Sequence, residues 1–224
     1  MRRALKIGHR GAAGHAPENT LAAIRKGVEL EVDFIEIDLR CSADDALVVI
    51  HDSTVDRTTN GKGRVDGLSL RDIKVLDAGN GESVPTLDEV LDVLQGNTGL
   101  MLELKIRGAA VRTVDAVRRA AFNAPVLYAS FLHDELAIIR AIDGKASVMP
   151  LFGRLPLSPV ERAMKYGASH VGLRHDTASR RLVDAFHAQD LAVFVYTADN
   201  TRDIARVLSI GVDGVISNVP ERIP

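Results

Sequence analysis

The stretch Asp33-Phe34-Ile35-Glu36-Ile37-Asp38-Leu39 decides how this chain folds. It has the apolar character of a buried β-strand, yet it carries two acids, Glu36 and Asp38, two residues apart. Successive side chains of a strand point to opposite faces, so the two carboxylates lie side by side on one face. Burying an unpaired carboxylate costs several kcal/mol or forces it to take up a proton. The pair therefore predicts a cation close to this strand.

A second apolar stretch, Leu100-Met101-Leu102-Glu103-Leu104-Lys105, ends with charged residues at the same spacing. Glu103 and Lys105 again share one face of a strand. Two strands that end in this way indicate a metal-centred active site more than an accident of packing.

Short apolar segments alternate with amphipathic segments of helix length along the chain. The expected strands span Leu5–Gly8, Phe34–Leu39, Leu100–Leu104, Val126–Ala129, Ser147–Leu151, His170–Leu173, Ala192–Tyr196 and Gly214–Ser217. The expected helices span Thr20–Glu31, Leu87–Leu94, Ala109–Ala121, Asp134–Ile142, Pro159–Tyr166, Ser179–Gln189 and Arg202–Ile210. In these helical segments apolar residues recur at intervals of three and four.

Eight strands that alternate with helices predict a TIM (β/α)8 barrel, which belongs to the α/β class. A doubly wound open sheet is the structural alternative, because periodicity alone does not show that the sheet closes. No Gly-x-Gly-x-x-Gly sequence follows a strand. Its absence weakens the dinucleotide-binding version of the open sheet.

The interval between the second and third strands is unusually long. It measures about sixty residues, roughly twice what a loop, a helix and a loop require. The extra material, within Cys41–Val84, contains the apolar run Leu47–Ile50, which should fold back beside the second strand. It also contains Asn60-Gly61, a strong turn signal. We predict a small inserted cap over residues 44–84 at the barrel mouth, within a single domain spanning residues 1–224.

The composition fits a globular protein with an ample core and without a polyanionic partner. The chain has 224 residues, of which 46% are hydrophobic, and a formal net charge of −2, so nothing favours nucleic acid or an anionic membrane. A single cysteine, Cys41, excludes an internal disulfide. No apolar segment resembles a signal peptide or is long enough to span a bilayer. We expect a cytoplasmic protein without stable membrane association.

Several polar residues follow directly after expected strands. His9 and Arg10 follow the first strand, and His51 follows the run Leu47–Ile50. In a parallel barrel the carboxyl ends of all strands form one rim, and that rim holds the active site. We therefore expect these side chains to meet the acids of the second and third strands, although they lie far apart in the chain.

The acids and bases of this rim predict a metal ion and a phosphate. Glu36, Asp38 and Glu103 offer three hard oxygen ligands, which suit Mg²⁺ or Ca²⁺ with waters or substrate oxygens completing the shell. Arg10 and Lys105 outweigh the negative charge that remains, and a dication beside an arginine and a lysine suits a phosphate.

Two histidines, His9 and His51, flank the expected metal site. Imidazoles with a pKa near neutrality transfer protons, one as base and one as acid. Metal, cations and a histidine pair together describe phosphodiester cleavage. Taken alone, a histidine is more often structural than catalytic, and paired acids also occur on exposed strands. The shared rim is what favours a functional role.

These residues closely resemble those of the glycerophosphodiester phosphodiesterase family. The matching motifs are His9-Arg10-Gly11, Pro17-Glu18-Asn19-Thr20, Glu36-Ile37-Asp38, His51-Asp52, Asp56-Arg57-Thr58-Thr59-Asn60-Gly61, Pro85-Thr86-Leu87, Glu103-Leu104-Lys105 and, more weakly, Ser130-Phe131. Their order and spacing match along most of the chain. The resemblance implies a TIM barrel with a small cap that hydrolyses glycerophosphodiesters, such as glycerophosphocholine or glycerophosphoethanolamine, to glycerol 3-phosphate and an alcohol.

The resemblance also implies a role for each candidate residue. It makes Glu36, Asp38 and Glu103 the ligands of Mg²⁺ or Ca²⁺. It makes His9 and His51 the acid/base pair, and it makes Arg10 and Lys105 phosphate contacts. In the mechanism usually proposed for the family, a glycerol hydroxyl attacks phosphorus and the cyclic phosphate is then hydrolysed.

One segment departs from the family pattern. Near the end of the seventh strand the family usually has Trp-Thr followed by an Asn, whereas this chain has Tyr196-Thr197-Ala198-Asp199-Asn200 and no tryptophan. A tyrosine still provides a pocket wall and adds a hydroxyl. Phe131 and Tyr196 are candidate substrate contacts, either as pocket walls or as residues on the rim of the core.

Neighbouring polar residues have supporting roles in this interpretation. Glu18 braces the first loop, while Asn19 and Thr20 cap the first helix. Asp52 either orients His51 or shapes its turn. Arg57 and Asn60 hold the cap loop together. The other histidines are expected to be solvated or structural: His15, His133, His170, His175 and His187.

Two other functions use the same residues. A lysophospholipase D-like enzyme would need apolar surface at the mouth for acyl chains, whereas the cap run is polar, which favours small water-soluble diesters. A non-catalytic phosphodiester-binding protein would be expected to lack a ligand or a histidine, and none is missing.

Overall fold

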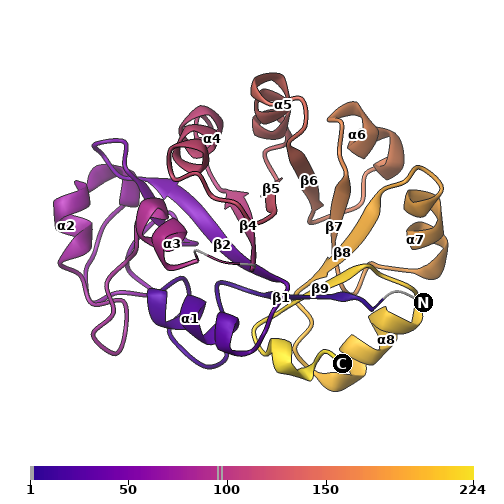
Figure 1. Cartoon of the computed structure of the whole chain (residues 1–224), viewed down its shortest axis with the longest axis horizontal. Helices are drawn as coiled ribbons and strands as arrows, with labels where there is room; N and C mark the ends of the chain where they lie inside the picture. Colours follow the sequence, from indigo (N-terminus) through magenta and orange to yellow (C-terminus); the bar gives the residue numbers. More distant parts are fainter. Residues whose placement is uncertain (1–2, 95, 97) are drawn as a thin grey trace.

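The computed structural model of this chain describes residues 3–94, 96 and 98–224. Its parallel strands are β1 Leu5–Gly8, β2 Phe34–Cys41, β4 Gly99–Leu104, β5 Val126–Ser130, β6 Ser147–Phe152, β7 His170–Arg174, β8 Ala192–Tyr196 and β9 Gly214–Ser217. They follow one another in the order β1-β9-β8-β7-β6-β5-β4-β2, and β2 pairs back with β1, where Ile7 lies opposite Phe34 (Figure 1). This pairing closes the ring. The fold is a TIM barrel, as predicted, and the open sheet is excluded.

Helices surround the ring on its outside (Figure 1). They are α1 Leu21–Glu29, α3 Leu87–Val93, α4 Ala110–Arg119, α5 His133–Ile142, α6 Pro159–Lys165, α7 Arg180–His187 and α8 Thr201–Ser209. Every expected helix forms, with slightly different ends. Thr20 caps α1 by accepting a hydrogen bond from the Ala23 N–H at 3.2 Å, and Thr86 forms a capping box with Glu89 on α3. Within the described residues, the Ser158 side chain makes no capping bond on α6.

The pleat of β2 separates its apolar side chains from its acids. Ile35 and Leu39 are fully buried in the cluster that packs against the surrounding helices. Glu36 and Asp38 point to the opposite side, into the barrel, where Asp38 lies opposite Glu103 of β4. An apolar layer fills the barrel interior: Ile7, Met101, Leu127, Ala129, Met149, Leu151, Phe194 and Ile216. The acids therefore lie at the carboxyl rim, above a packed core.

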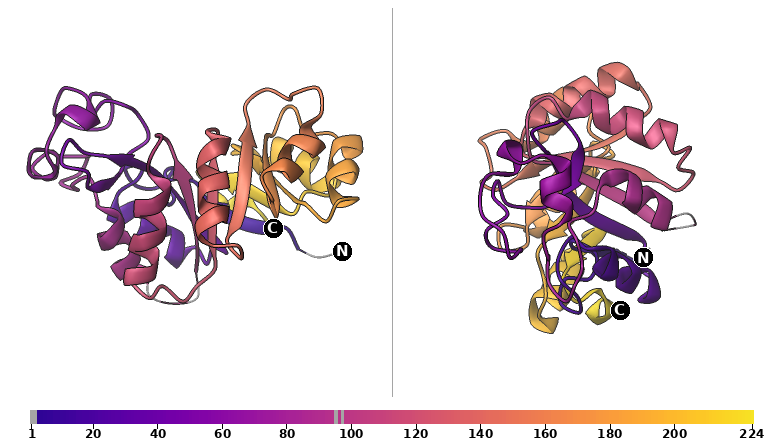
Figure 2. Two further views of the ribbon diagram at one scale, coloured as in Figure 1. Left: turned by 90° about the horizontal axis from the view of Figure 1, so that it is seen from above. Right: turned by 90° about the vertical axis from the view of Figure 1, so that its left-hand side faces the viewer.

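The insertion between β2 and β4 forms a small subdomain-like cap on one side of the barrel (Figure 2). Its strand β3, Leu47–Val49, pairs antiparallel with the end of β2, as expected, and extends β2 as far as Cys41. It also contains the 3-10 turn η1, Val65–Gly67, and helix α2, Leu70–Lys74, neither of which was predicted, because such short segments show no period. Its own apolar cluster comprises Val48, Ile50, Val55, Val65, Ile73, Ala78 and Val84.

The C-terminal segment ends in a second 3-10 turn, η2, Pro220–Arg222, which lies close to β1 in the fold. Across the described part of the chain, the helices are too short and too polar for any of them to cross a lipid bilayer.

Candidate active site

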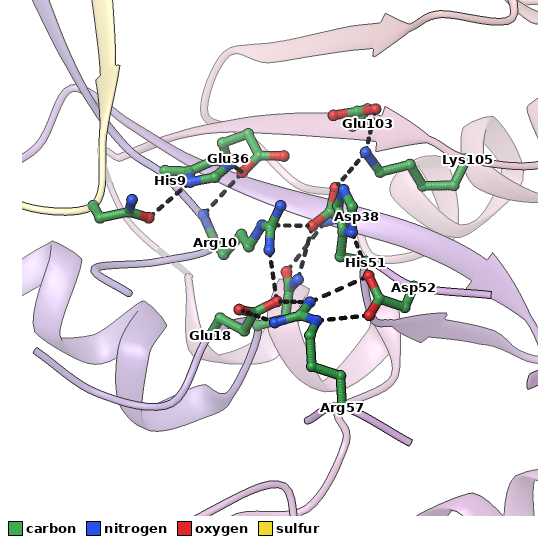
Figure 3. A network of polar contacts seen from close by, with 12 residues as sticks. His9, Arg10, Glu18, Glu36, Asp38, His51, Asp52, Arg57, Glu103 and Lys105 are labelled. Atoms are coloured by element: carbon green, nitrogen blue, oxygen red, sulfur yellow. Dashed lines mark hydrogen bonds and ion pairs between the residues drawn. The ribbon is translucent and has the colours of Figure 1, made fainter. Parts of the chain in front are cut away.

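Eight of the nine predicted site residues line one pocket of about 200 Å³ at the carboxyl rim. They are His9, Arg10, Glu36, His51, Glu103, Lys105, Phe131 and Tyr196. Asp38, the ninth, lies beneath the others with 1% of its surface exposed. Figure 3 shows how the polar members of this group come together from the ends of different strands. The other histidines of the described residues lie outside this pocket: His15, His133, His170, His175 and His187.

Three carboxylates form the centre of the site. One oxygen each of Glu36, Asp38 and Glu103 lies within 4.8 Å of the others. Glu36 Oε2 accepts a hydrogen bond from the backbone N–H of Arg10 at 2.8 Å, whereas its buried Oε1 has no hydrogen-bond partner among the described residues. A buried oxygen without a donor, next to two further carboxylates, is what an oxygen-coordinated dication requires. The three residues therefore fit Mg²⁺ or Ca²⁺.

The electrostatics of the three acids also fit a further positive charge at this cluster. Burial, together with the charge of Asp38, raises the pKa of Glu36 to about 8. Burial and the neighbouring carboxylates raise the pKa of Glu103 to about 7. Burial acts on Asp38 as well, but Lys105 and Arg10 keep the pKa of this carboxyl below its ordinary value. The two cations thus keep Asp38 ionised, whereas the positive charge beside Glu36 and Glu103 does not offset the burial of these two carboxyls.

Arg10 and Lys105 hold Asp38 from two sides. Arg10 Nε lies 3.2 Å from Asp38 Oδ2, and Lys105 Nζ lies 3.0 Å from Asp38 Oδ1. Lys105 also donates to Glu103, and Arg10 Nη1 donates to Glu18 at 2.6 Å. The charges of Asp38 and Glu103 outweigh burial and raise the pKa of Lys105, so this side chain is a cation in the pocket. Both cations line the pocket.

The two histidines are held in the same way, each through Nδ1. His51 Nδ1 lies 2.7 Å from Asp52 Oδ1, and His9 Nδ1 lies 2.7 Å from Asn218 Oδ1. His9 Nε2 is 4.0 Å from Glu36 Oε2. Burial lowers the pKa of both imidazoles, and the charge of Arg10 lowers that of His9 further. Both rings therefore present a neutral Nε2 edge at neutral pH.

A charged network connects the cap to these histidines (Figure 3). Arg57 donates to both oxygens of Glu18 at 2.8 Å and to Asp52 through Nε at 2.6 Å. Arg57 and His51 lower the pKa of Asp52, and Arg57 with Arg10 lowers that of Glu18 against the effect of burial. Asp52 thus has the contact expected of a residue that orients His51. Glu18 joins the cap to the loop after β1, which is more than the local bracing that was predicted.

Two asparagines reach the site without having been predicted. The Asn19 side chain donates to Asp38 Oδ2 at 2.8 Å and accepts from the Asp38 N–H at 3.2 Å. The prediction that Asn19 caps α1 is wrong, because Thr20 does so and Asn19, with φ 59°, turns inward. Asn218 directly follows β9, so the rule that polar residues after strands face the rim would have identified it.

Phe131 and Tyr196 form an aromatic wall of the pocket. Their ring centroids are 5.9 Å apart with perpendicular planes, and Lys105 Nζ is 5.9 Å from the centroid of Phe131. Phe131 is 45% exposed. Of the two positions considered for these residues, the structure places them on the pocket wall.

The chain matches one protein family over nearly its whole length. Residues 9–222 match the model of the glycerophosphoryl diester phosphodiesterase family. A glycerophosphodiester phosphodiesterase of Caldanaerobacter subterraneus is 33% identical over 233 residues, covering 98% of this chain and 96% of that protein. One of Bacillus subtilis is 29% identical over 248 residues, covering 98% and 85% respectively.

Solved structures give the same result. An Oleispira antarctica phosphodiesterase, determined in complex with the product sn-glycerol-3-phosphate, superposes with a TM-score of 0.93 at 27% identity over 100% of this chain and 95% of that one. A glycerophosphodiester phosphodiesterase of Agrobacterium tumefaciens has a TM-score of 0.86 at 31% identity, covering 100% and 99%. The chain therefore belongs to the glycerophosphoryl diester phosphodiesterase family of enzymes.

Proposed function

We propose that this enzyme hydrolyses small glycerophosphodiesters, such as glycerophosphocholine or glycerophosphoethanolamine, to glycerol 3-phosphate and an alcohol. We propose that it does so within one domain, residues 1–224, that includes the cap at residues 44–84. The observation that carries the proposal is the carboxylate cluster, whose oxygens lie within 4.8 Å of one another beside two imidazoles. The relative from Oleispira antarctica holds sn-glycerol-3-phosphate as its product, which supports the same product here.

Glu36, Asp38 and Glu103 are the proposed ligands of a divalent cation, Mg²⁺ or Ca²⁺. When bound, such an ion supplies positive charge to the phosphoryl oxygens. Arg10 and Lys105 add side-chain cations that contact the phosphate and hold it in the pocket. Together these groups stabilise the charge that builds up on the oxygens in the transition state.

His9 and His51 are the proposed proton-transfer pair. One imidazole takes the proton from a glycerol hydroxyl as its oxygen attacks phosphorus, and the other protonates the oxygen of the leaving alcohol. The P–O bond to the alcohol breaks and a cyclic phosphate forms. Water then opens this ring with the two imidazoles exchanging roles, which yields glycerol 3-phosphate.

A metal-replacement assay tests the proposal. Purified protein is treated with EDTA, dialysed, and assayed for glycerol 3-phosphate release from glycerophosphocholine with and without Mg²⁺ or Ca²⁺. We expect turnover to disappear and to return with the ion. Glu36→Gln should remove ion binding and turnover together, whereas the exposed Glu29→Gln should change neither. Full activity after chelation would contradict the metal assignment.

Histidine variants test the chemistry separately from the metal. His9→Ala and His51→Ala should each lower kcat by about 10²–10⁴-fold, the usual contribution of general acid–base catalysis, while the ion still binds. His187→Ala, on the outside of the barrel, is the matched control. A His9 or His51 variant with the wild-type rate would remove that residue from the mechanism.

The apolar surface of the rim favours a second candidate substrate, a lysophospholipid. Phe131 is 45% exposed, and Leu155 and Leu157, on the loop after β6, are 39% and 106% exposed. The polar cap run argued against acyl chains, but these side chains come from other loops of the same rim. Rates on glycerophosphocholine and on a lysophosphatidylcholine, measured below its micelle concentration, decide between the two substrates.

A further inference from the structure

His9 is connected to the last strand of the barrel. Its backbone N–H donates to the Ser217 carbonyl at 2.9 Å, and its Nδ1 lies 2.7 Å from Oδ1 of the next residue, Asn218. Since β1 and β9 are neighbours in the ring, this contact is made directly across the strand pair. Both histidines are held through Nδ1, but the partner of His9 is an amide, whereas the partner of His51 is a carboxylate.

The amide of Asn218 can take only one orientation. Its Nδ2 donates to Asp199 Oδ2 at 2.7 Å, and its backbone N–H donates to Asp199 Oδ1 at 2.8 Å. The Ser217 hydroxyl donates to the same Oδ1 at 3.0 Å. An ionised carboxylate only accepts hydrogen bonds, so the NH₂ of Asn218 must face Asp199 and its oxygen must face His9.

The orientation of the amide fixes the protons of His9. A carbonyl oxygen accepts and cannot donate, so His9 Nδ1 must be the nitrogen that carries the proton. In the neutral ring, Nε2 is then the unprotonated nitrogen. His9 lines the pocket, and this Nε2 is 4.0 Å from Glu36 Oε2, close to where the phosphate would bind.

We propose that Asn218, held by Asp199, is a positioning residue that keeps His9 in the Nδ1–H tautomer with its Nε2 directed into the pocket. This inference rests on the proposed role of His9 in proton transfer. A chain of three residues thus runs from the loop after β8, through the end of β9, to the imidazole. It assigns a function to Asp199, which lies in the segment where this chain departs from the family pattern.

Exchanging the side chains of Asp199 and Asn218 tests the inference. Asn218→Asp places two carboxylates in contact at a distance where an amide now donates, so it should disrupt the arrangement. In the double variant Asp199→Asn, Asn218→Asp, the new amide NH₂ at 199 donates to the new carboxylate at 218, which still accepts from His9 Nδ1. Oδ1 of residue 199 still accepts from the Ser217 hydroxyl and from the backbone N–H of residue 218. The double variant should therefore recover kcat relative to Asn218→Asp alone.

Asn218→Ala removes the acceptor altogether. We expect kcat to fall by about 10–100-fold, the usual effect of losing an orienting partner, with KM nearly unchanged. In ¹⁵N-labelled protein, the His9 signals, assigned by their loss in His9→Ala, should show a protonated Nδ1 in the wild type and a mixture of tautomers in Asn218→Ala. The exposed Asn123→Ala should change neither kcat nor the tautomer.

The possible results separate the inference from the proposed function. A wild-type kcat and an unchanged Nδ1–H signal in Asn218→Ala would overturn the inference. If that variant does not fold, the exchange decides: a double variant no more active than Asn218→Asp overturns the inference, and recovery supports it. If His9→Ala retains full activity, the role of His9 in proton transfer fails, while the NMR signal still reports whether Asn218 sets the tautomer.

Discussion

Arg57 of the cap binds Glu18 of the loop after β1 with two parallel hydrogen bonds, Nη1 to Oε2 and Nη2 to Oε1, both at 2.8 Å. The same guanidinium donates to Asp52, which in turn holds His51 Nδ1. A single side chain therefore connects the cap, the first loop of the barrel and one of the two pocket histidines. The planar guanidinium suits this role, because its fork of N–H donors binds one carboxylate with two parallel bonds while it also donates to another, whereas a lysine ammonium acts as a point charge.

Arg57→Lys should lower activity by loosening His51. The variant retains the positive charge but loses the bidentate contact with Glu18, so Asp52 no longer holds the His51 ring in one orientation. We expect kcat to fall by about tenfold, in the range found for lost orienting contacts, with a small change in KM. Steady-state kinetics on glycerophosphocholine measures both.

Arg64→Lys is the matched control for this variant. Arg64 lies in the same cap and forms a bidentate pair with Asp66, but both side chains are exposed and lie outside the pocket lining. Solvent screens exposed ion pairs of this kind, so we expect the Arg64 substitution to have little effect. Equal kinetics for the two lysine variants would show that the Arg57 network has no part in positioning His51.

Metal-free protein should become less stable as the pH rises, because of Glu36. Burial raises the pKa of this carboxyl from 4.5 to about 8 in the folded state. The stability associated with its protonated form is therefore fully present below about pH 4.5 and is lost as the pH rises to about 8. Glu36→Gln cannot ionise, so in EDTA it should unfold at a higher temperature than the wild type at pH 8, by about 2–4 °C for each kcal/mol gained.

Thermal unfolding at pH 6 and pH 8 measures this difference. With Mg²⁺ or Ca²⁺ added, the wild type should instead unfold at the higher temperature. The ion binds only the folded wild type and stabilises it, and it leaves Glu36→Gln unaffected. Glu29→Gln, at an exposed position of α1, controls for a general effect of removing one charge. If the unfolding temperatures of the wild type and Glu36→Gln in EDTA change with pH in the same way, ionisation of Glu36 does not destabilise the folded protein.

The barrel and most of the site could be predicted because both follow from local patterns. The acids of Phe34–Leu39 interrupt an apolar strand, and the pleat alone places them on one face. Parallel strands then bring their carboxyl ends to one rim, so His9 and Glu103 are neighbours in space regardless of their separation in sequence. No side-chain contact had to be known for this step.

The position of Asn218 after β9 places it at the rim, but the roles of the two asparagines could not be predicted, because they depend on contacts between distant segments. Asn19-Thr20 satisfies the rule for a helix N-cap with either residue, and only the folded backbone shows that Thr20 caps while Asn19 turns toward Asp38. Asn218 is held by Asp199, which lies 19 positions away in the sequence, and nothing local in either residue indicates the other. Helix α2 was missed for a different reason, since five residues are too few to show a period.

Asn19→Gly should weaken binding of the divalent cation without straining the backbone. Asn19 has φ 59°, a conformation that glycine adopts freely, so the substitution removes only the two hydrogen bonds to Asp38. Ligands that lose such a partner bind their metal about 10–100-fold more weakly. Isothermal titration of the EDTA-treated variant with Mg²⁺ or Ca²⁺ measures the change.

Asn80→Gly controls for the effect of a new glycine. Asn80 has a similar φ of 56°, but it is exposed in the cap. Its substitution should leave ion affinity at the wild-type value. An Asn19→Gly variant that binds the ion as tightly as Asn80→Gly would show that Asn19 does not organise the ligand set.

Tyr196→Phe should stabilise the free enzyme or leave its stability unchanged, and yet impair substrate binding. The Tyr196 hydroxyl is buried and finds no hydrogen-bond partner in the residues that the structure describes, and a buried unsatisfied group of this kind costs about 1–3 kcal/mol. Burial also raises the pKa of this phenol, so it remains a neutral donor at working pH. Because the ring lines the pocket next to Phe131, we expect the hydroxyl to donate to a substrate oxygen once a substrate is bound. We therefore expect a thermal midpoint equal to or above that of the wild type, together with a higher KM for glycerophosphocholine.

Tyr128→Phe, a change of the same kind outside this pocket, should leave KM unaltered. An unchanged KM in Tyr196→Phe would mean that the hydroxyl does not contact the substrate and that the aromatic ring alone forms the wall.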